Sequence, residues 1–189
     1  MRADARAKRA QIISAAMEQF RTRPASAVTM EAIASDAGVG IATVYRHFPT
    51  RATLREACAL GFFDLFDEFS AATIVGFDDA PEEQWENFVW KLVDYGVGMI
   101  GSELVGEIRP GTDAELEATR DRFFSGVKLL LEKAAAHGLV DPDLTPAELA
   151  SELIVATRPM DAQFTELFPD VRGRLVRHLL LAWRSAPAA

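Results

Sequence analysis

The stretch from Thr29 to Phe48, TMEAIASDAGVGIATVYRHF, constrains the fold most, because it holds the start and stop signals of two short helices. Thr29 offers a hydroxyl to the free N–H groups of a first helix, and Glu31 places a negative charge in that helix's positive first turn. Gly38 supplies the left-handed residue that ends the helix, and Val39 follows as an apolar residue able to fold back. The stretch therefore predicts two helices joined by a tight glycine turn.

The second helix of the pair is expected to bury Val44 and Phe48, with Ile41 near its start. Ala34 is small at the point where the second helix must pass close to the first. The spacing of Ala34, Gly38 and Val44 meets the steric needs of a helix-turn-helix, whose second helix enters the DNA major groove. The sequence therefore predicts a DNA-binding module.

The distribution of charge agrees with this prediction, although the net charge of the 189 residues is −8. Residues 1–55 hold nine Lys/Arg and four Asp/Glu, which makes them +5 and leaves −13 for residues 56–189. A basic segment on an acidic remainder is typical of a DNA-binding module attached to a body that does not bind DNA. Taken alone, the same asymmetry would equally fit chance variation in solvated surface charge.

Composition indicates a soluble, cytoplasmic protein. Apolar residues make up 49% of the chain, yet no run approaches the roughly 18 apolar residues of a membrane span. No apolar segment follows the charged N-terminus, so no secretory signal is expected. The single Cys58 excludes an internal disulfide framework and fits a reducing compartment.

Apolar residues recur at three-and-four spacing along most of the chain, and no stretch alternates as a strand would, so an all-α fold is expected. Thr50, Asp79, Thr112 and Thr145 are predicted N-caps. The helix that Thr50 opens is expected to reach about Ile74 and to join the basic and acidic parts without a flexible linker. Helices are expected over 5–22, 29–37, 41–48, 51–74, 79–100, 112–137, 145–157 and 170–184.

The residues TMEAIASDAGVGIATVYRHFPTRATL resemble the N-terminal domain of TetR-family transcriptional regulators, and the resemblance covers roughly residues 8–60. Beyond residue 60 it is only architectural. It implies a helix-turn-helix DNA-binding domain at 1–55 and a helical ligand-binding and dimerisation domain at 56–189. It also implies a ligand-responsive regulator, expected to be a repressor, that binds a palindromic operator as a homodimer and is released by a small apolar or aromatic effector.

The resemblance places DNA contacts on the second helix of the motif and at the starts of its neighbours. Hydroxyl, imidazole and guanidinium donors suit phosphate oxygens, and helix N-termini favour phosphate. Packing within the head is the alternative for Tyr45, and a plain surface position is the alternative for His47. The expected DNA-contacting residues are Thr29, Gly40, Ile41, Ala42, Thr43, Tyr45, Arg46, His47, Thr50 and Arg51.

The start of the second helix, Gly40-Ile41-Ala42, departs from the family, whose members often carry polar or basic residues there. These side chains cannot form bidentate hydrogen bonds with guanine or adenine, although Ile41 and Ala42 could touch a thymine methyl group. Sequence reading is therefore expected to depend on few contacts, on DNA shape and on the basic N-terminal arm.

The body is expected to hold the effector among aromatic side chains and to pair with a second copy. The last two long helices are expected to form the dimer interface through Leu149, Leu153, Leu175, Leu179 and Trp183, with closure of the monomer's own core as the alternative. Packing in the core is likewise the alternative for each aromatic residue of the pocket, and Arg120 and His137 could supply polarity or be solvated. The expected effector-binding residues are Phe62, Phe66, Trp85, Phe88, Tyr95, Met99, Arg120, Phe123 and Phe124.

No enzyme pattern emerges from the sequence. It has no Gly-rich phosphate loop and no nucleophile elbow, and Cys58 with His47, His137 and His178 gives no metal-ligand spacing. No catalysis, cofactor, metal or membrane contact is expected, and the expected partners are double-stranded DNA, a second copy and an effector. The rival hypothesis is a DNA-binding protein whose body binds another protein; an open apolar cavity would favour the effector, and a solid core the rival.

Overall fold

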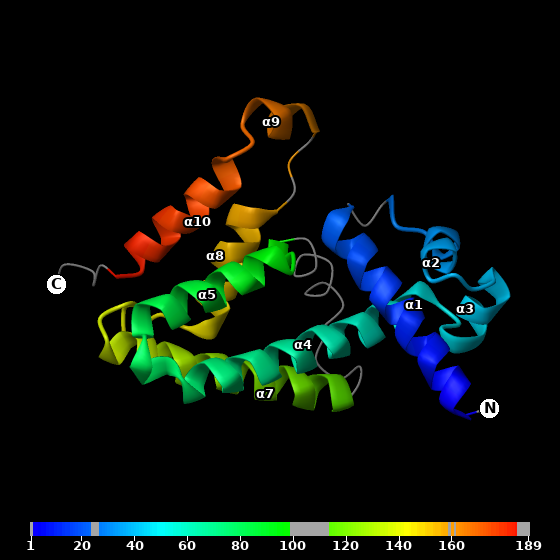
Figure 1. Cartoon of the computed structure of the whole chain (residues 1–189), viewed down its shortest axis with the longest axis horizontal. Helices are drawn as coiled ribbons and strands as arrows, with labels where there is room; N and C mark the ends of the chain where they lie inside the picture. Colours follow the sequence, from blue (N-terminus) through cyan, green and yellow to red (C-terminus); the bar gives the residue numbers. More distant parts are fainter. Residues whose placement is uncertain (1, 24–26, 99–113, 159, 161, 185–189) are drawn as a thin grey trace.

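The computed structural model describes residues 2–23, 27–98, 114–158, 160 and 162–184, and every regular element in these ranges is a helix. This confirms the predicted all-α fold (Figure 1). None of these helices is long and apolar enough to cross a bilayer. The elements in chain order are α1 (Arg2–Thr22), α2 (Met30–Asp36), α3 (Ile41–His47), α4 (Arg51–Val75), the 3-10 helix η2 (Phe77–Asp79), α5 (Pro81–Asp94), α7 (Ala114–Ala136), α8 (Pro146–Thr157), α9 (Ala162–Leu167) and α10 (Val171–Ala182).

Helices α1, α2 and α3 form a small head at one end of the molecule (Figure 1). Their shared core buries Ile12 and Phe20 of α1, Ile33 of α2, Val44 of α3, and Phe48 directly after α3. Full burial of such side chains stabilises a fold by about 1.5–3 kcal/mol each. This core fixes which face of α3 points outward.

The turn between α2 and α3 has the predicted glycine geometry. Gly38 has φ +63°, and its N–H donates to the Ser35 carbonyl over 3.1 Å. The Val39 N–H donates to the Ala34 carbonyl over 3.0 Å, which completes the paired hydrogen bonds of a glycine-terminated helix. Gly138 ends α7 in the same way, with φ +69°.

Three predicted N-caps are confirmed: Thr29 at the start of α2, Thr50 at the start of α4 and Thr145 at the start of α8. The Thr53 N–H donates to Thr50 Oγ1 over 3.1 Å at the start of α4. At the start of α8, the Glu148 N–H donates to Thr145 Oγ1 and the Thr145 N–H donates to Glu148 Oε2, at 3.2 and 2.9 Å. Pro146 occupies the first helical position, where its missing N–H costs nothing.

The prediction for α5 is wrong at its start and too long at its end. Asp79 belongs to η2, so the residue before α5 is Ala80, whose side chain cannot cap. The helix ends at Asp94 rather than near residue 100, because Gly96 turns the backbone into the left-handed region at φ +79°. The predicted cap Thr112 lies outside the described residues, and α9 was not expected.

Helix α4 connects the head to the body. Its 25 residues span about 37 Å at 1.5 Å per residue, and no flexible linker interrupts them. Leu54, near its start, is buried against the head, whereas Phe62 and Phe66 are buried farther along, where α4 runs beside α7 (Figure 1).

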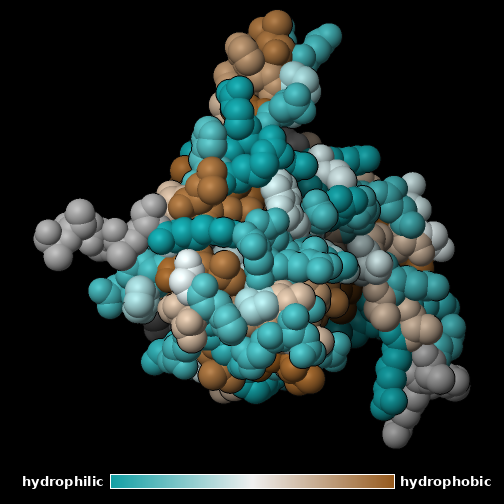
Figure 2. Space-filling view, turned by 60° about the vertical axis from the view of Figure 1, so that its left-hand side comes forward, coloured by the Kyte–Doolittle hydropathy of each residue, from teal (hydrophilic) through white to brown (hydrophobic). Residues whose placement is uncertain are grey.

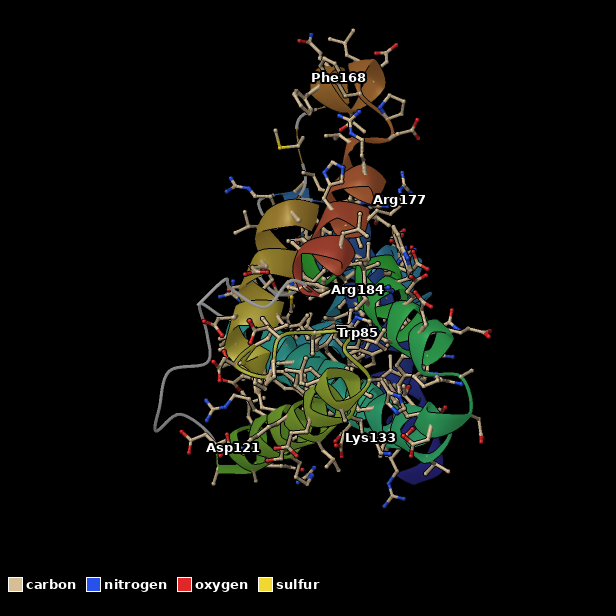
Figure 3. The ribbon with its side chains drawn as sticks, turned by 90° about the vertical axis from the view of Figure 1, so that its left-hand side faces the viewer. Trp85, Asp121, Lys133, Phe168, Arg177 and Arg184 are labelled. Atoms are coloured by element: carbon tan, nitrogen blue, oxygen red, sulfur yellow. The ribbon has the colours of Figure 1, made fainter. Side chains whose placement is uncertain are left out.

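Helix α10 closes the body against α8 and α5. The Trp183 indole N–H donates to Glu152 Oε2 over 2.6 Å, which links α10 to α8. Arg184 donates to Glu82 Oε1 over 2.6 Å and thereby links the end of α10 to α5. The Trp183 ring lies edge-on to Trp85 of α5, with 6.0 Å between centroids; Figure 3 labels Trp85 and Arg184.

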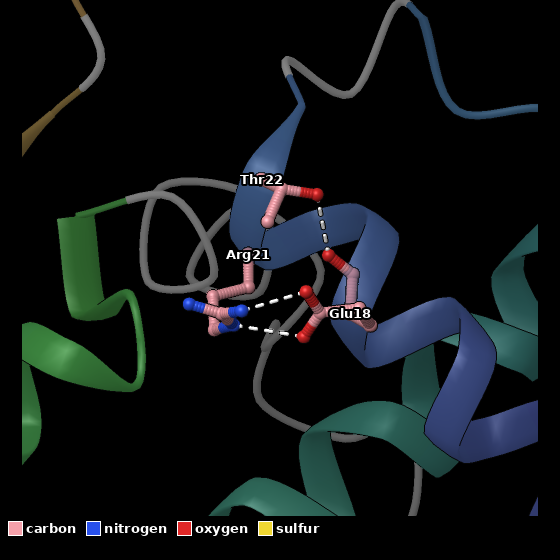
Figure 4. Close-up of polar contacts among 3 residues, drawn as sticks. All are labelled: Glu18, Arg21 and Thr22. Atoms are coloured by element: carbon pink, nitrogen blue, oxygen red, sulfur yellow. Dashed lines mark hydrogen bonds and ion pairs between the residues drawn. The ribbon is translucent and has the colours of Figure 1, made fainter.

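A second contact between head and body lies at the C-terminal end of α1. A Cβ atom on Gly96 would stand 2.7 Å from Cγ of Arg21, so this backbone lies directly against the arginine. Glu18 holds the Arg21 guanidinium through two hydrogen bonds of 2.9 and 2.6 Å (Figure 4). These bonds also lower the pKa of the Glu18 carboxyl below its usual range.

Gly98 packs equally closely on the end of α8. A Cβ atom there would lie 2.4 Å from the carbonyl carbon and oxygen of Thr157. Residues 96–98 therefore contact α1 of the head on one side and α8 of the body on the other.

Gly98→Ala is expected to destabilise the protein by about 2–3 kcal/mol, because the added methyl group meets backbone atoms that cannot rotate away. Urea unfolding followed by circular dichroism measures the change. Gly61→Ala is the matched control, since its Cβ would make only ordinary van der Waals contacts, with the Met17 sulfur at 3.6 Å and Ile13 Cγ2 at 3.9 Å, and alanine favours the α4 helix. Equal stabilities of the two variants would contradict the close contact at Gly98.

Cys58 is expected to react slowly with thiol reagents in the native protein. Burial in α4 raises the pKa of its thiol to about 12, so the reactive thiolate is scarce at pH 8. Labelling with a chromogenic disulfide should be slower than in urea on the order of a thousandfold, given an unfolded pKa near 8.5. Equal rates in both conditions would show that the thiol is accessible.

Candidate functional site

The outward face of α3 is the first candidate surface. Because Val44 and Phe48 bury one side of the helix, the opposite side is left to solvent. Among the predicted DNA contacts, Thr43 and His47 are half-buried, and the others in this region are exposed. The exposed positions are Gly40, Ile41, Ala42, Tyr45, Arg46, Thr50 and Arg51.

Tyr45 has 46% of its surface exposed, so its phenol does not belong to the core of the head. Phe48, by contrast, is buried, as its predicted packing role requires. The Arg9 guanidinium of α1 lies 5.1 Å from the centre of the Phe48 ring, which brings a cation of the first helix beside the end of α3. The His47 ring is tilted against the same phenylalanine at 6.4 Å.

Helix starts flank this surface. Thr29 caps α2, which packs against α3, and its Oγ1 accepts the Ala32 N–H at 3.1 Å. A threonine hydroxyl that accepts in this way still has a proton to donate. Thr50 and Arg51 stand at the positive end of the α4 dipole, where an anion is stabilised. The ten predicted DNA-contacting residues therefore lie on α3 and on the starts of α2 and α4.

The second candidate site is a cavity of about 220 Å³ in the body, between α4, α5, α7 and α8. Four predicted pocket residues line it: Phe62, Arg120, Phe123 and Phe124. The remaining lining was not predicted, and α8 contributes most of it. These further residues are Phe63, Leu92, Val97, Val127, Pro146, Leu149, Ala150, Leu153 and Ile154.

The other predicted pocket residues lie elsewhere. Phe66, Trp85 and Phe88 are fully buried but pack among aromatic neighbours instead of lining the cavity. Tyr95 packs edge-on against Phe66 and faces a separate surface groove beside α1. Met99 lies outside the described residues.

Val97 places the cavity next to the contact between head and body. Its side chain lines the cavity, while its neighbours Gly96 and Gly98 lie against Arg21 and Thr157. A molecule in the cavity would therefore touch the same short segment that braces α1 and α8.

Helices α8, α9 and α10 and their connections carry exposed large apolar side chains. The prediction that Leu149, Leu153 and Trp183 form a dimer interface is wrong, because all three are buried in the chain's own core. Figure 2 shows apolar side chains at the projecting tip, where Figure 1 places α9. The exposed apolar side chains of these helices and their connections are Val155, Met160, Leu167, Phe168, Leu175 and Leu181.

His137 takes part in an ion-pair cluster outside the cavity. Its Nε2 lies 3.1 Å from Asp78 Oδ1, and Lys133 Nζ donates to Asp78 Oδ2 over 2.6 Å. These two partners, Lys133 first, lower the pKa of the Asp78 carboxyl. The cluster attaches η2 to α7, and within the described ranges no three His, Cys, Asp or Glu residues are grouped as metal ligands would be.

Comparison with known proteins covers both the head and the whole chain. Residues 12–58 match the family model described as bacterial regulatory proteins, tetR family. The nucleoid occlusion factor SlmA of Marinobacter nauticus is 23% identical over 188 residues, covering 96% of this chain and 89% of that protein.

Two crystal structures extend the likeness to the complete architecture. A TetR transcription regulatory protein from Mycobacterium vanbaalenii has a TM-score of 0.61 and 26% identity, covering 97% of this chain and 99% of that one. The TetR transcriptional regulator SCO0520 from Streptomyces coelicolor has a TM-score of 0.60 and 26% identity, covering 95% and 99%. With the helix-turn-helix geometry of α2 and α3, these matches show that the chain belongs to the TetR family of transcriptional regulators.

Proposed function

We propose that this regulator is a repressor that binds a palindromic operator as a homodimer and leaves it when a small apolar or aromatic effector enters the body. One observation supports this proposal most directly. The chain combines an outward-facing α3 with an apolar cavity of about 220 Å³ in the body, and α4 connects the two. We assign DNA binding to residues 1–55 and effector binding and dimerisation to residues 56–189, and we place the protein in the cytoplasm, with the DNA.

The exposed residues of α3 would contact DNA. Tyr45 and His47 would donate to phosphates, while Thr43 would touch a base edge or a thymine methyl group. Thr29, Thr50 and Arg51 would hold the phosphates that flank the groove. Since Ile41 and Ala42 offer no hydrogen bonds, specificity would depend on DNA shape as well as on contacts.

Dimerisation would cover the exposed apolar side chains of α8 and α10. A symmetric interface pairs one patch with its own copy, and two heads then meet the two halves of a palindrome. Val155 and Leu181 are exposed on these two helices, in contrast to the buried Leu149 and Leu153. The interface that we propose is therefore the outer, not the inner, face of the predicted helix pair.

The open cavity favours an effector over a body that binds only another protein, because a body of the second kind needs no internal space. A ligand shifts an equilibrium only by its differential affinity for the two states. A molecule that presses on Phe62 of α4 and on Val97 beside Gly96 would prefer a different angle between body and head. That preference would weaken the fit of two heads to one operator.

Capture of genomic fragments by the purified protein, followed by sequencing, tests the DNA-binding role. One set of palindromic fragments should be enriched, and their affinity should fall about 10³-fold between 50 and 200 mM salt if several phosphates are contacted. Absence of enrichment, or binding indifferent to salt, would contradict the proposal.

Tyr45→Ala is expected to weaken binding to all DNA sequences by a similar factor, about tenfold, because a phosphate contact carries no sequence information. Its thermal unfolding should stay close to that of the wild type, since the side chain is largely exposed. Tyr45→Phe removes only the hydroxyl, so comparing it with Tyr45→Ala distinguishes the contribution of the hydroxyl to DNA binding from that of the ring. If the Tyr45→Ala protein instead unfolds at a much lower temperature than the wild type, Tyr45 has a packing role in the head.

Leu181→Glu is expected to shift the protein from dimer to monomer, because it places a charge on the proposed apolar interface. Light scattering and sedimentation velocity measure the change. Val75→Glu is the matched control: Val75 is 88% exposed at the end of α4, and Leu181 is 64% exposed on α10. An unchanged dimer in Leu181→Glu would place the interface elsewhere.

A further inference from the structure

The lining of the effector cavity contains one polar side chain, Arg120, among twelve apolar ones in the described part of the chain. We infer that the effector is a small apolar acid whose single carboxylate pairs with Arg120. This inference rests on the proposed function, since it specifies what enters the cavity. It follows from the place of Arg120 in the cavity lining, from its present partner and from the hydrogen-bonding capacity of its guanidinium.

Arg120 is held at present by a weak partner. Its Nε and Nη2 donate to a single oxygen of Asp121, at 3.1 and 2.9 Å. The Asp121 side chain is 67% exposed and the Arg120 side chain 26% exposed. Because an ion pair with a solvated partner contributes little to stability, exchange of Asp121 for another carboxylate costs little. Figure 3 labels Asp121, which lies on α7.

The chemistry of arginine selects the polar group of the ligand. A guanidinium has only donors and is always charged, so its partner must be an acceptor. A carboxylate accepts two parallel N–H groups from it, which makes a strong pair of defined geometry. The described lining holds no Asp or Glu to receive an ammonium group. The phenylalanine faces could attract a cation, but the nearby guanidinium opposes it.

The aromatic lining and the volume of the cavity indicate the apolar part of the ligand. Phe123 lies 5.4 Å from Phe63 and 5.2 Å from Phe124, centroid to centroid, which forms an aromatic wall next to Arg120. An apolar cavity of about 150 Å³ holds benzene, so about 220 Å³ holds roughly nine carbon atoms. A phenyl ring with two methylene groups fills this space and leaves its carboxylate at Arg120.

Isothermal titration calorimetry of the full chain with three probes of one shape tests the inference. The probes are 3-phenylpropanoate, 3-phenylpropanamide and 3-phenylpropylamine at pH 7.5, which present an anion, a neutral amide and a cation. The acid should bind about tenfold tighter than the amide, and the amine should bind more weakly than both. Arg120→Gln should bring acid and amide within twofold of each other.

Two further variants make the result specific. Arg122→Gln is the matched control, because Arg122 pairs with Asp64 and Thr119 and does not line the cavity; it should keep the preference for the acid. Ala150→Leu fills part of the cavity and should weaken the acid and the amide alike. Circular dichroism checks that each variant is folded.

Equal affinity for acid and amide in the wild type, a preference that survives Arg120→Gln, or tighter binding of the amine would overturn the inference. If acid and amide bind equally and Ala150→Leu weakens both, only the anion preference fails and the effector cavity stands. If no probe binds, or Ala150→Leu changes nothing, the effector role itself fails together with the inference.

Discussion

One continuous hydrophobic core runs from the head into the body, helix α4 passes through both parts, and the rest of the structure depends on this shared packing. Leu54 is buried near the start of α4, and Phe62, which borders the cavity of the body, is buried about two helical turns or 12 Å farther along the axis. No linker separates them, and the hydrogen bonds of the helix prevent it from stretching or folding between the two positions. A change in how the body packs around Phe62 is therefore carried to the head.

Residues 96–98 form a second connection between the head and the body, in addition to α4. Gly96 lies against Arg21 of α1 and Gly98 against Thr157 of α8, at distances that exclude even a methyl group. Val97 between them lines the cavity. With both connections in place, the angle between head and body is set at two points, and both points border the space that we assign to the effector.

Local signals in the sequence predicted local structure well. Gly38 and the Thr145–Glu148 cap act within one helical turn, so their geometry follows from the residues themselves. The prediction of Asp79 as an N-cap was wrong, because Asp79 is the last residue of the 3-10 helix η2. This helix forms where Phe77 is buried in the body, a tertiary contact that the local sequence does not specify. The pocket was only partly predicted. Trp85 and Phe62 each belong to the apolar stripe of a helix, so the sequence does not distinguish them. Only the packing of the helices decides that Phe62 borders the cavity and that Trp85 does not.

The central claim is that the cavity and the DNA surface are coupled, and coupling is reciprocal for binding free energies. Titration of 3-phenylpropanoate into the protein alone and into the protein saturated with its operator measures it most directly. We predict weaker binding to the operator-bound protein, by the same factor by which saturating ligand weakens operator binding. Identical affinity in the two states would contradict the account.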